Sequence, residues 1–257
     1  LCMDPIKLEK FCSEECEFVD GILVNKKTKR KIRVLVIVHV FGNMADMERI
    51  LDIAKKYNLK VLEDATEALG TYYTEGKYKG KYAGTIGDIG VLSFNANKII
   101  TTGGGGMVVG DNEELVEKVR FLSSQAKKDP LYFIHDEIGY NYRMLNLQAA
   151  LGTSQIDQLE DFIKTKIRNY KIYKEQLEEI DGLEILPFRG GTRANHWFYS
   201  LKIDKERYGI GRDELLKKLV EAEIQTRPIW GLIHQQKSYI SCQNYKMEKS
   251  LYYYDRV

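Results

Sequence analysis

The sequence predicts an α/β fold in which a mixed, mostly parallel sheet with flanking helices is followed by a small α/β domain. Residues 33–40 are rich in β-branched side chains, a pattern typical of a strand buried on both faces. Apolar residues repeat at helical spacing from Met44 to Tyr57, and a short strand-like run follows at residues 60–63. A strand, a helix and a second strand in this order indicate a parallel βαβ unit.

The rest of the chain predicts further helices and strands in alternation. Asp4 and Pro5 suit the first turn of a helix at residues 5–16, and the basic residues 25–31 suit a solvated turn. Residues 71–87 predict a surface connection. The remaining predictions are strands at 89–94, 107–110 and 197–203, helices at 112–124 and 212–222, and a largely helical stretch at 146–180. We expect residues 1–145 to form part of a large domain, 146–180 a connecting helix, and 181–257 part of a small domain.

Composition excludes several classes of protein. The 257 residues include 39 basic and 37 acidic residues, a net charge of +2, so the chain lacks the basic excess of a nucleic-acid binder. No apolar run approaches the roughly 18 residues that a membrane span needs. Cys12 and Cys16 lie one helical turn apart, but no second pair with zinc spacing accompanies them. We therefore expect no metal, reduced thiols and a cytoplasmic location.

Two segments carry reactive side chains at the ends of predicted strands. Asp64 lies in EDATEALG, where its carboxylate can cap a following helix or reach a ligand at the carboxyl edge of the sheet. Lys98 ends SFNANK, where it is either an ordinary surface lysine or an amine that forms a Schiff base because burial or a cationic neighbour lowers its pKa.

Two further segments are ambiguous when taken alone. Residues 101–106, TTGGGG, suit either a flexible turn or a close approach of the backbone to a ligand. They lack the GK(S/T) ending of a phosphate-binding P-loop, so we reject that function. Residues 139–144, GYNYRM, suit the start of a helix with aromatic packing.

Together these segments resemble the DegT/DnrJ/EryC1/StrS family of sugar aminotransferases. Its members show EDAAQALG-like, SFxxxK, TTGEGGM-like and GxNYRM stretches in the same order. Residues 39–47, HVFGNMADM, are similar to the family's HxxGxxADM, and residues 147–152 match as well. The resemblance covers almost the whole chain, and the order and spacing of the motifs make it specific.

The resemblance implies the fold type I architecture of pyridoxal-phosphate (PLP) enzymes, like that of aspartate aminotransferase. Lys98 would carry PLP and move the proton during transfer, and Asp64 would pair with the pyridinium nitrogen. Ser93 would bind the cofactor phosphate. Asn141 would reach the phosphate held by a partner subunit, which implies a homodimer. Glu67 would lie near the phenolic oxygen, where the family usually has Gln. An ionised carboxylate there would repel that oxygen, so Glu67 is either protonated or turned elsewhere.

The resemblance also implies the substrates. Glutamate would donate the amino group to a nucleotide-linked keto-sugar, a UDP- or GDP-4-keto-6-deoxyhexose, for surface or secondary glycan biosynthesis. Arg227 would bind a donor carboxylate or a diphosphate, with His234 near the substrate, although this segment also suits packing in the small domain. The family's Glu in TTGEGGM is Gly104 here, which we interpret as a subfamily difference.

Some family features are not visible in the sequence. Members carry an N-terminal segment with a small-residue phosphate loop and an aromatic residue that stacks on the cofactor, and they also carry a further C-terminal stretch. We therefore expect an incomplete chain with weak PLP binding and poor activity. Two alternatives remain. A PLP-dependent dehydratase of the same fold is disfavoured because it has His in place of Lys98, whereas a non-catalytic scaffold or regulatory protein of this fold stays open.

Overall fold

The chain, seen here in a computed structural model, divides into two compact units within the described residues 1–129 and 131–257. The larger unit comprises residues 2–166 and 188–197, and the smaller unit comprises Leu1 with residues 167–187 and 198–257. The domain boundaries expected from the sequence, 1–145, 146–180 and 181–257, stay a prediction.

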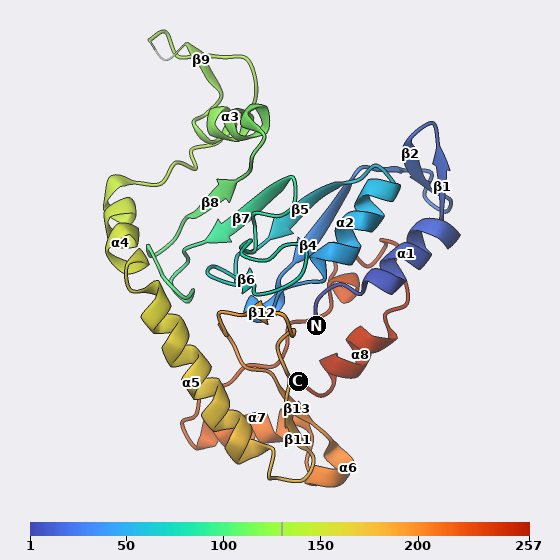
Figure 1. Ribbon diagram of the computed structural model, residues 1–257, viewed down its shortest axis with the longest axis vertical. Coiled ribbons are helices and arrows are strands. Elements are labelled where there is room, and N and C mark those ends of the chain that lie inside the picture. Colours follow the sequence, from blue (N-terminus) through green and yellow to red (C-terminus); the bar gives the residue numbers. More distant parts are fainter. Residues whose placement is uncertain (130) are drawn as a thin grey trace. The chain divides into compact units, whose positions relative to one another are not determined.

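A four-stranded sheet forms the centre of the larger unit (Figure 1). Its strands, in spatial order, are β4 (Val34–Val38), β5 (Lys60–Asp64), β7 (Ile89–Ser93) and β8 (Gly106–Val109). β4 and β5 are parallel, β5 and β7 are parallel, and β7 and β8 are antiparallel. The prediction of a mixed, mostly parallel sheet is confirmed.

Strand β4 is covered on one face only. Leu35 and Ile37 are buried, whereas Val34 and Val36 are 50% and 52% exposed. The prediction that this strand is buried on both faces is therefore wrong. A β-branched run indicates a strand, but it does not reveal whether the second face is covered, and here the covered side chains alternate with exposed ones.

Two helices cover the buried face of the sheet. α2 (Met47–Lys56) begins at Asp46, whose side chain accepts a hydrogen bond from the Arg49 amide, and it buries a stripe at helical spacing against the strands. α1 (Pro5–Glu14) packs beside α2 and is capped by Asp4 as predicted (Figure 1). The helix ends before Cys16, which begins a strand instead, so the two cysteines do not share a helix.

Shorter elements complete the larger unit. They are β1 (Cys16–Val19), β2 (Ile22–Asn25), β3 (Lys31–Ile32), η1 (Val40–Gly42), β6 (Tyr72–Tyr73), α3 (Glu113–Ser123), β9 (Lys127–Asp129), β10 (Ile134–His135), α4 (Asn146–Ile156) and β12 (Thr192–Arg193). β12 pairs antiparallel with β6, and this pairing returns residues 188–197 to the larger unit. α5 (Leu159–Leu177) continues from the larger unit into the smaller one, so the helical stretch predicted at 146–180 is two helices.

The smaller unit combines a two-stranded antiparallel sheet with short helices. Its elements are β11 (Leu183–Ile185), β13 (Leu201–Ile203), α6 (Lys205–Tyr208), α7 (Arg212–Glu221), η2 (Ile233–Gln235) and α8 (Glu248–Tyr254). The strand predicted at 197–203 is shorter, since only its last three residues pair with β11, and Trp197 belongs to the larger unit. Within the described part of the chain, every helix is too short or too polar to span a bilayer.

Candidate active site

The carboxyl ends of β5 and β7 bring Asp64 and Ser93 to the same edge of the sheet. Asp64 is the last residue of β5 and pairs in register with Val91 of β7, two residues before Ser93. Both side chains are half-buried. Ligands of open α/β sheets bind at this edge. An Asp64 carboxylate oxygen accepts a hydrogen bond from the Thr66 amide at 3.1 Å, which closes a turn rather than capping a helix.

Lys98 lies in the turn that connects β7 to β8. Its amide donates a hydrogen bond to the Asn95 carbonyl at 3.0 Å, and its side chain is only 12% exposed. A lysine amine this well covered is uncommon for a surface residue. Burial lowers the pKa of the Lys98 amine from its ordinary value, although the charges of Glu67 and Asp64 oppose that change. A larger neutral fraction makes the amine a better nucleophile.

Trp197 joins this turn from a distant part of the sequence. Its indole N–H donates a hydrogen bond to the Asn97 carbonyl at 2.8 Å, and the Lys98 Nζ atom lies 4.2 Å from the centroid of its ring. The indole therefore fixes the backbone beside Lys98 and also offers its π face to the amine. No local sequence pattern points to Trp197, because the carbonyl that it contacts lies 100 residues earlier in the chain.

Glu67 points toward Lys98 from the segment after β5. Its Oε1 atom lies 4.0 Å from Lys98 Nζ, and its Oε2 atom accepts a hydrogen bond from the Phe41 amide at 2.6 Å. Burial raises the pKa of the Glu67 carboxyl, against the opposing effects of the Phe41 hydrogen bond and the Lys98 charge. Phe41 has a left-handed backbone, with φ 58°, which aims its amide at this carboxylate.

A buried network supports the loops that carry these groups. His39 Nε2 lies 2.8 Å from Glu63 Oε2, and both side chains are fully buried. The other ring nitrogen of His39, Nδ1, accepts a hydrogen bond from the Ala45 amide, which leaves Nε2 as the atom that donates to Glu63. The Glu63 carboxylate also accepts from the amides of Gly84, Ile86 and Gly87. These bonds fix the residue directly before Asp64.

Asn195 forms a second clamp on the same loops. Its side-chain amide donates to the carbonyls of Glu67 at 2.8 Å and Leu69 at 3.0 Å, while its Oδ1 atom accepts from the Trp197 amide at 3.0 Å. Asn195 thus connects the backbone of Glu67 to that of Trp197. No local sequence pattern signals this role.

The other predicted site residues are not part of this cluster. Asn141 is exposed in the connection between β10 and α4, where it forms a β-bridge with Ser124. Arg227 and His234 belong to the smaller unit. Arg227 is exposed and donates to the Thr226 carbonyl at 2.9 Å, and His234 is half-buried in η2. Their roles stay predictions.

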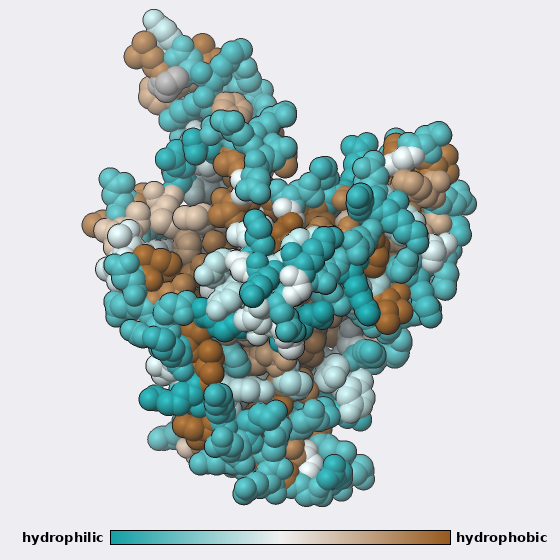
Figure 2. All heavy atoms as spheres, in the orientation of Figure 1, coloured by the Kyte–Doolittle hydropathy of each residue, from teal (hydrophilic) through white to brown (hydrophobic). Residues whose placement is uncertain are grey.

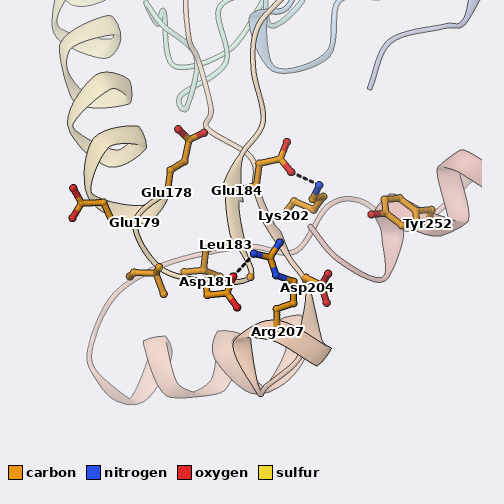
Figure 3. Close-up of a pocket in the computed structure, with 11 residues that line it drawn as sticks. Glu178, Glu179, Asp181, Leu183, Glu184, Lys202, Asp204, Arg207 and Tyr252 are labelled. Atoms are coloured by element: carbon orange, nitrogen blue, oxygen red, sulfur yellow. Dashed lines mark hydrogen bonds and ion pairs between the residues drawn. The ribbon is translucent and has the colours of Figure 1, made fainter.

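The smaller unit contains a hollow of about 440 Å³, which includes none of the predicted site residues (Figure 3). Five carboxylates line it, from Glu178, Glu179, Asp181, Glu184 and Asp204. Its two basic side chains are already paired, Lys202 with Glu184 and Arg207 with Asp181. The hollow therefore offers no free positive charge to an anionic substrate.

A family model for the DegT/DnrJ/EryC1/StrS aminotransferases matches residues 18–257. The chain belongs to this family. It is 36% identical over 91% of its length to the putative pyridoxal phosphate-dependent aminotransferase EpsN of Bacillus subtilis, and 37% identical over 84% of its length to the GDP-perosamine synthase of Escherichia coli O157:H7. It spans 56% and 57% of the lengths of these two relatives.

The fold of the family is confirmed by solved structures. Helicobacter pylori PseC, an aminotransferase of pseudaminic acid biosynthesis, superposes with a TM-score of 0.82 at 24% identity, over 99% of this chain and 64% of that one. The fold type I prediction is therefore confirmed. Family aminotransferases use PLP, as the sequence also predicted. A covered lysine amine beside carboxylates, at the carboxyl edge of a parallel sheet, fits that cofactor.

Proposed function

We propose that the protein acts as a PLP-dependent aminotransferase that moves an amino group from glutamate to a nucleotide-linked keto-sugar. The observation that supports this function best is the Lys98 amine, which is nearly buried and faces Glu67 and Trp197 at the end of β7. A lysine in such surroundings is suited to covalent chemistry with an aldehyde and to proton transfer. The family and the EpsN and perosamine synthase relatives support the same function.

In this proposal each site residue has a separate task. PLP supplies an electron sink when bound. Lys98 attaches the cofactor and holds or releases a proton at Nζ. Asp64 keeps the ring nitrogen protonated, Ser93 binds the phosphate, and Asn141 reaches the phosphate bound by a second copy. Arg227 and His234 contact the substrate.

The acceptor we propose is a GDP- or UDP-4-keto-6-deoxyhexose for surface or secondary glycan biosynthesis. The GDP alternative is supported by the Escherichia coli relative, whose name specifies GDP-perosamine synthesis. We also propose a cytoplasmic location, which is supported by the four free cysteines.

We further propose a homodimer. Apolar side chains that follow β9 and extend into the start of α4 are strongly exposed, and Figure 2 shows hydrophobic residues among hydrophilic ones in the region of α4. They are Leu131, Tyr132, Phe133, Ile138, Tyr142, Leu145 and Leu147. An exposed apolar surface of this kind marks an interaction site, and the segment includes Asn141, for which a role across the interface was predicted.

The first experiment adds PLP to the protein, reduces the mixture with borohydride and maps the modified peptide. Modification of Lys98 supports the proposal, and incubation with glutamate and each keto-sugar nucleotide then identifies the acceptor from the aminated product. If Lys98→Ala protein bound PLP with the same spectrum as wild type, Lys98 would not be the attachment site. A chain that takes up no PLP would agree with the incomplete, poorly active chain expected from the sequence, or with the non-catalytic scaffold.

A further inference from the structure

Hydrogen bonds hold both the backbone and the side chain of Glu67, and its carboxylate faces Lys98. Asn195 holds its backbone carbonyl at 2.8 Å, and the Phe41 amide holds its Oε2 atom at 2.6 Å. The other carboxylate oxygen lies 4.0 Å from Lys98 Nζ. The Glu67 side chain is 8% exposed, so solvent screens this pair far less than it screens a surface ion pair.

The anchor at Phe41 fixes the direction of the carboxylate. Phe41 has a positive φ of 58°, a conformation that a bulky side chain seldom adopts. That backbone turns the amide toward Glu67, so the local strain is compensated by a short hydrogen bond to a carboxylate. A glutamine at position 67 could accept the same bond through its amide oxygen, but it could not supply a charge to Lys98.

Among the described residues, few charged groups act on Lys98 and Glu67. Lys98 Nζ interacts with the carboxylates of Glu67 and Asp64 and with the Trp197 ring. Glu67 interacts with Lys98 and Asp64, and the Cys2 thiol also lies within its electrostatic influence. Burial favours the neutral form of the amine, whereas the nearby carboxylates favour its ammonium form.

We propose that Glu67 is the counter-ion of the Lys98 amine, a positioning residue that sets the pH range in which Nζ holds its proton. This inference rests on the proposed role of Lys98. The amine must lose its proton to attack an aldehyde, and it must regain one when it acts as a base. Glu67 stabilises the protonated state, which makes Lys98 a stronger base than burial alone would allow.

The test measures protonation of Lys98 in the protein without cofactor. Reaction of Lys98 with acetic anhydride is followed by peptide mapping as a function of pH, in wild type, Glu67→Gln, Glu67→Asp and Glu117→Gln. Removal of the charge in Glu67→Gln should lower the pKa of Lys98 by about one to three units. Glu67→Asp should recover part of that shift. Glu117 pairs with Arg120 on exposed α3, so its variant should titrate like wild type.

Coincident titration curves for wild type and Glu67→Gln would overturn the proposal. If Glu67→Gln does not fold, the reciprocal measurement applies, because coupling between two sites acts equally in both directions. Carbon-13 NMR of the Glu67 carboxyl should then show a higher pKa in Lys98→Met than in wild type, and an unchanged pKa would again overturn the proposal.

The outcome is separable from that of the proposed function. If PLP labels Lys98 in wild type but Lys98 titrates identically in Glu67→Gln, the aminotransferase proposal stands. The counter-ion role of Glu67 is then rejected. A shifted titration in a protein that never binds PLP would keep the counter-ion and remove the aminotransferase.

Discussion

The Nε2 atom of His39 lies 2.8 Å from the Oε2 atom of Glu63, and neither side chain is exposed to solvent. Glu63 is the residue before Asp64, and His39 follows β4, so this pair connects the ends of two neighbouring parallel strands. Because Glu63 also accepts three backbone hydrogen bonds, it fixes the edge of the sheet at which the candidate site lies.

Glu63→Gln should therefore destabilise the protein strongly. The amide nitrogen of Gln cannot accept a hydrogen bond, so buried donors lose their acceptor, which costs about 3 kcal/mol in free energy of unfolding. Urea unfolding monitored by circular dichroism measures the change. Glu9→Gln is the matched control, because Glu9 pairs with Lys56 on the surface, where solvent screens the charges, and the variant should be much less destabilised. Equal losses in the two variants would contradict the assigned role.

The same network predicts how stability depends on pH. Burial alone would raise the pKa of Glu63, but the hydrogen bonds from His39 and from the amides of Gly87 and Gly84 place it below its ordinary value of 4.5. The resulting stabilisation is present above pH 4.5 and is lost as the pH falls through the pKa of the folded state. Unfolding experiments across this range should show a steeper loss in wild type than in Glu63→Gln.

Gly42→Ala should cost more than Gly80→Ala, although both glycines have positive φ, 86° and 81°. A methyl group on Gly42 would lie 1.8 Å from Asn195 Oδ1, whereas nothing lies within 4 Å of one on Gly80. We expect a loss of about 1 kcal/mol at Gly80 from backbone strain alone, and about 3 kcal/mol at Gly42 from strain and overpacking. Similar unfolding midpoints for the two variants would show that Asn195 moves aside without destabilising the folded state.

Trp197→Phe should weaken attachment of PLP while keeping an aromatic ring beside Lys98. The variant loses the hydrogen bond to the Asn97 carbonyl, which contributes about 1 kcal/mol, or about fivefold in affinity. Titration with PLP, monitored by absorbance and borohydride trapping, measures the affinity. Trp230→Phe, in the smaller unit, should bind PLP like wild type, and an equal loss there would indicate a general effect.

Leu147→Lys should weaken the proposed dimer, because Leu147 is 85% exposed on α4 and a charge disfavours burial in an interface. Sedimentation velocity over a range of protein concentrations measures the association. Val220→Lys adds the same charge at an exposed position on α7, outside the proposed surface, and should associate like wild type. A wild-type protein that remained monomeric throughout would contradict the proposal.

Features with a local signature could be predicted from the sequence. Asp4 caps α1 as expected, and the strand–helix–strand order correctly indicated the parallel part of the sheet. Asp64 and Ser93 reached the same edge because parallel strands end there. Each of these follows from neighbouring residues, which determine hydrogen bonding and periodicity within one element.

Features that depend on distant contacts could not be predicted. The open face of β4 depends on what packs against the strand, and the contact of Trp197 with Asn97 depends on a return of the chain through β12. The direction of Glu67 was similarly open, since its sequence position allowed a protonated carboxyl or one turned elsewhere. The hydrogen bond from the Phe41 amide fixes the direction of the Glu67 carboxylate, and it depends on a backbone conformation of Phe41 that no sequence motif indicates.

The return of residues 188–197 to the larger unit also limits how the two units can be exchanged between relatives. A chimera with one junction after residue 166 would replace Asn195 and Trp197 along with the smaller unit. The residue that contacts Lys98 at this position would then come from the other relative. Recombination that preserves the lysine's surroundings requires two crossovers that flank β12. An exchange of the smaller unit therefore has to keep this ten-residue segment with the larger unit.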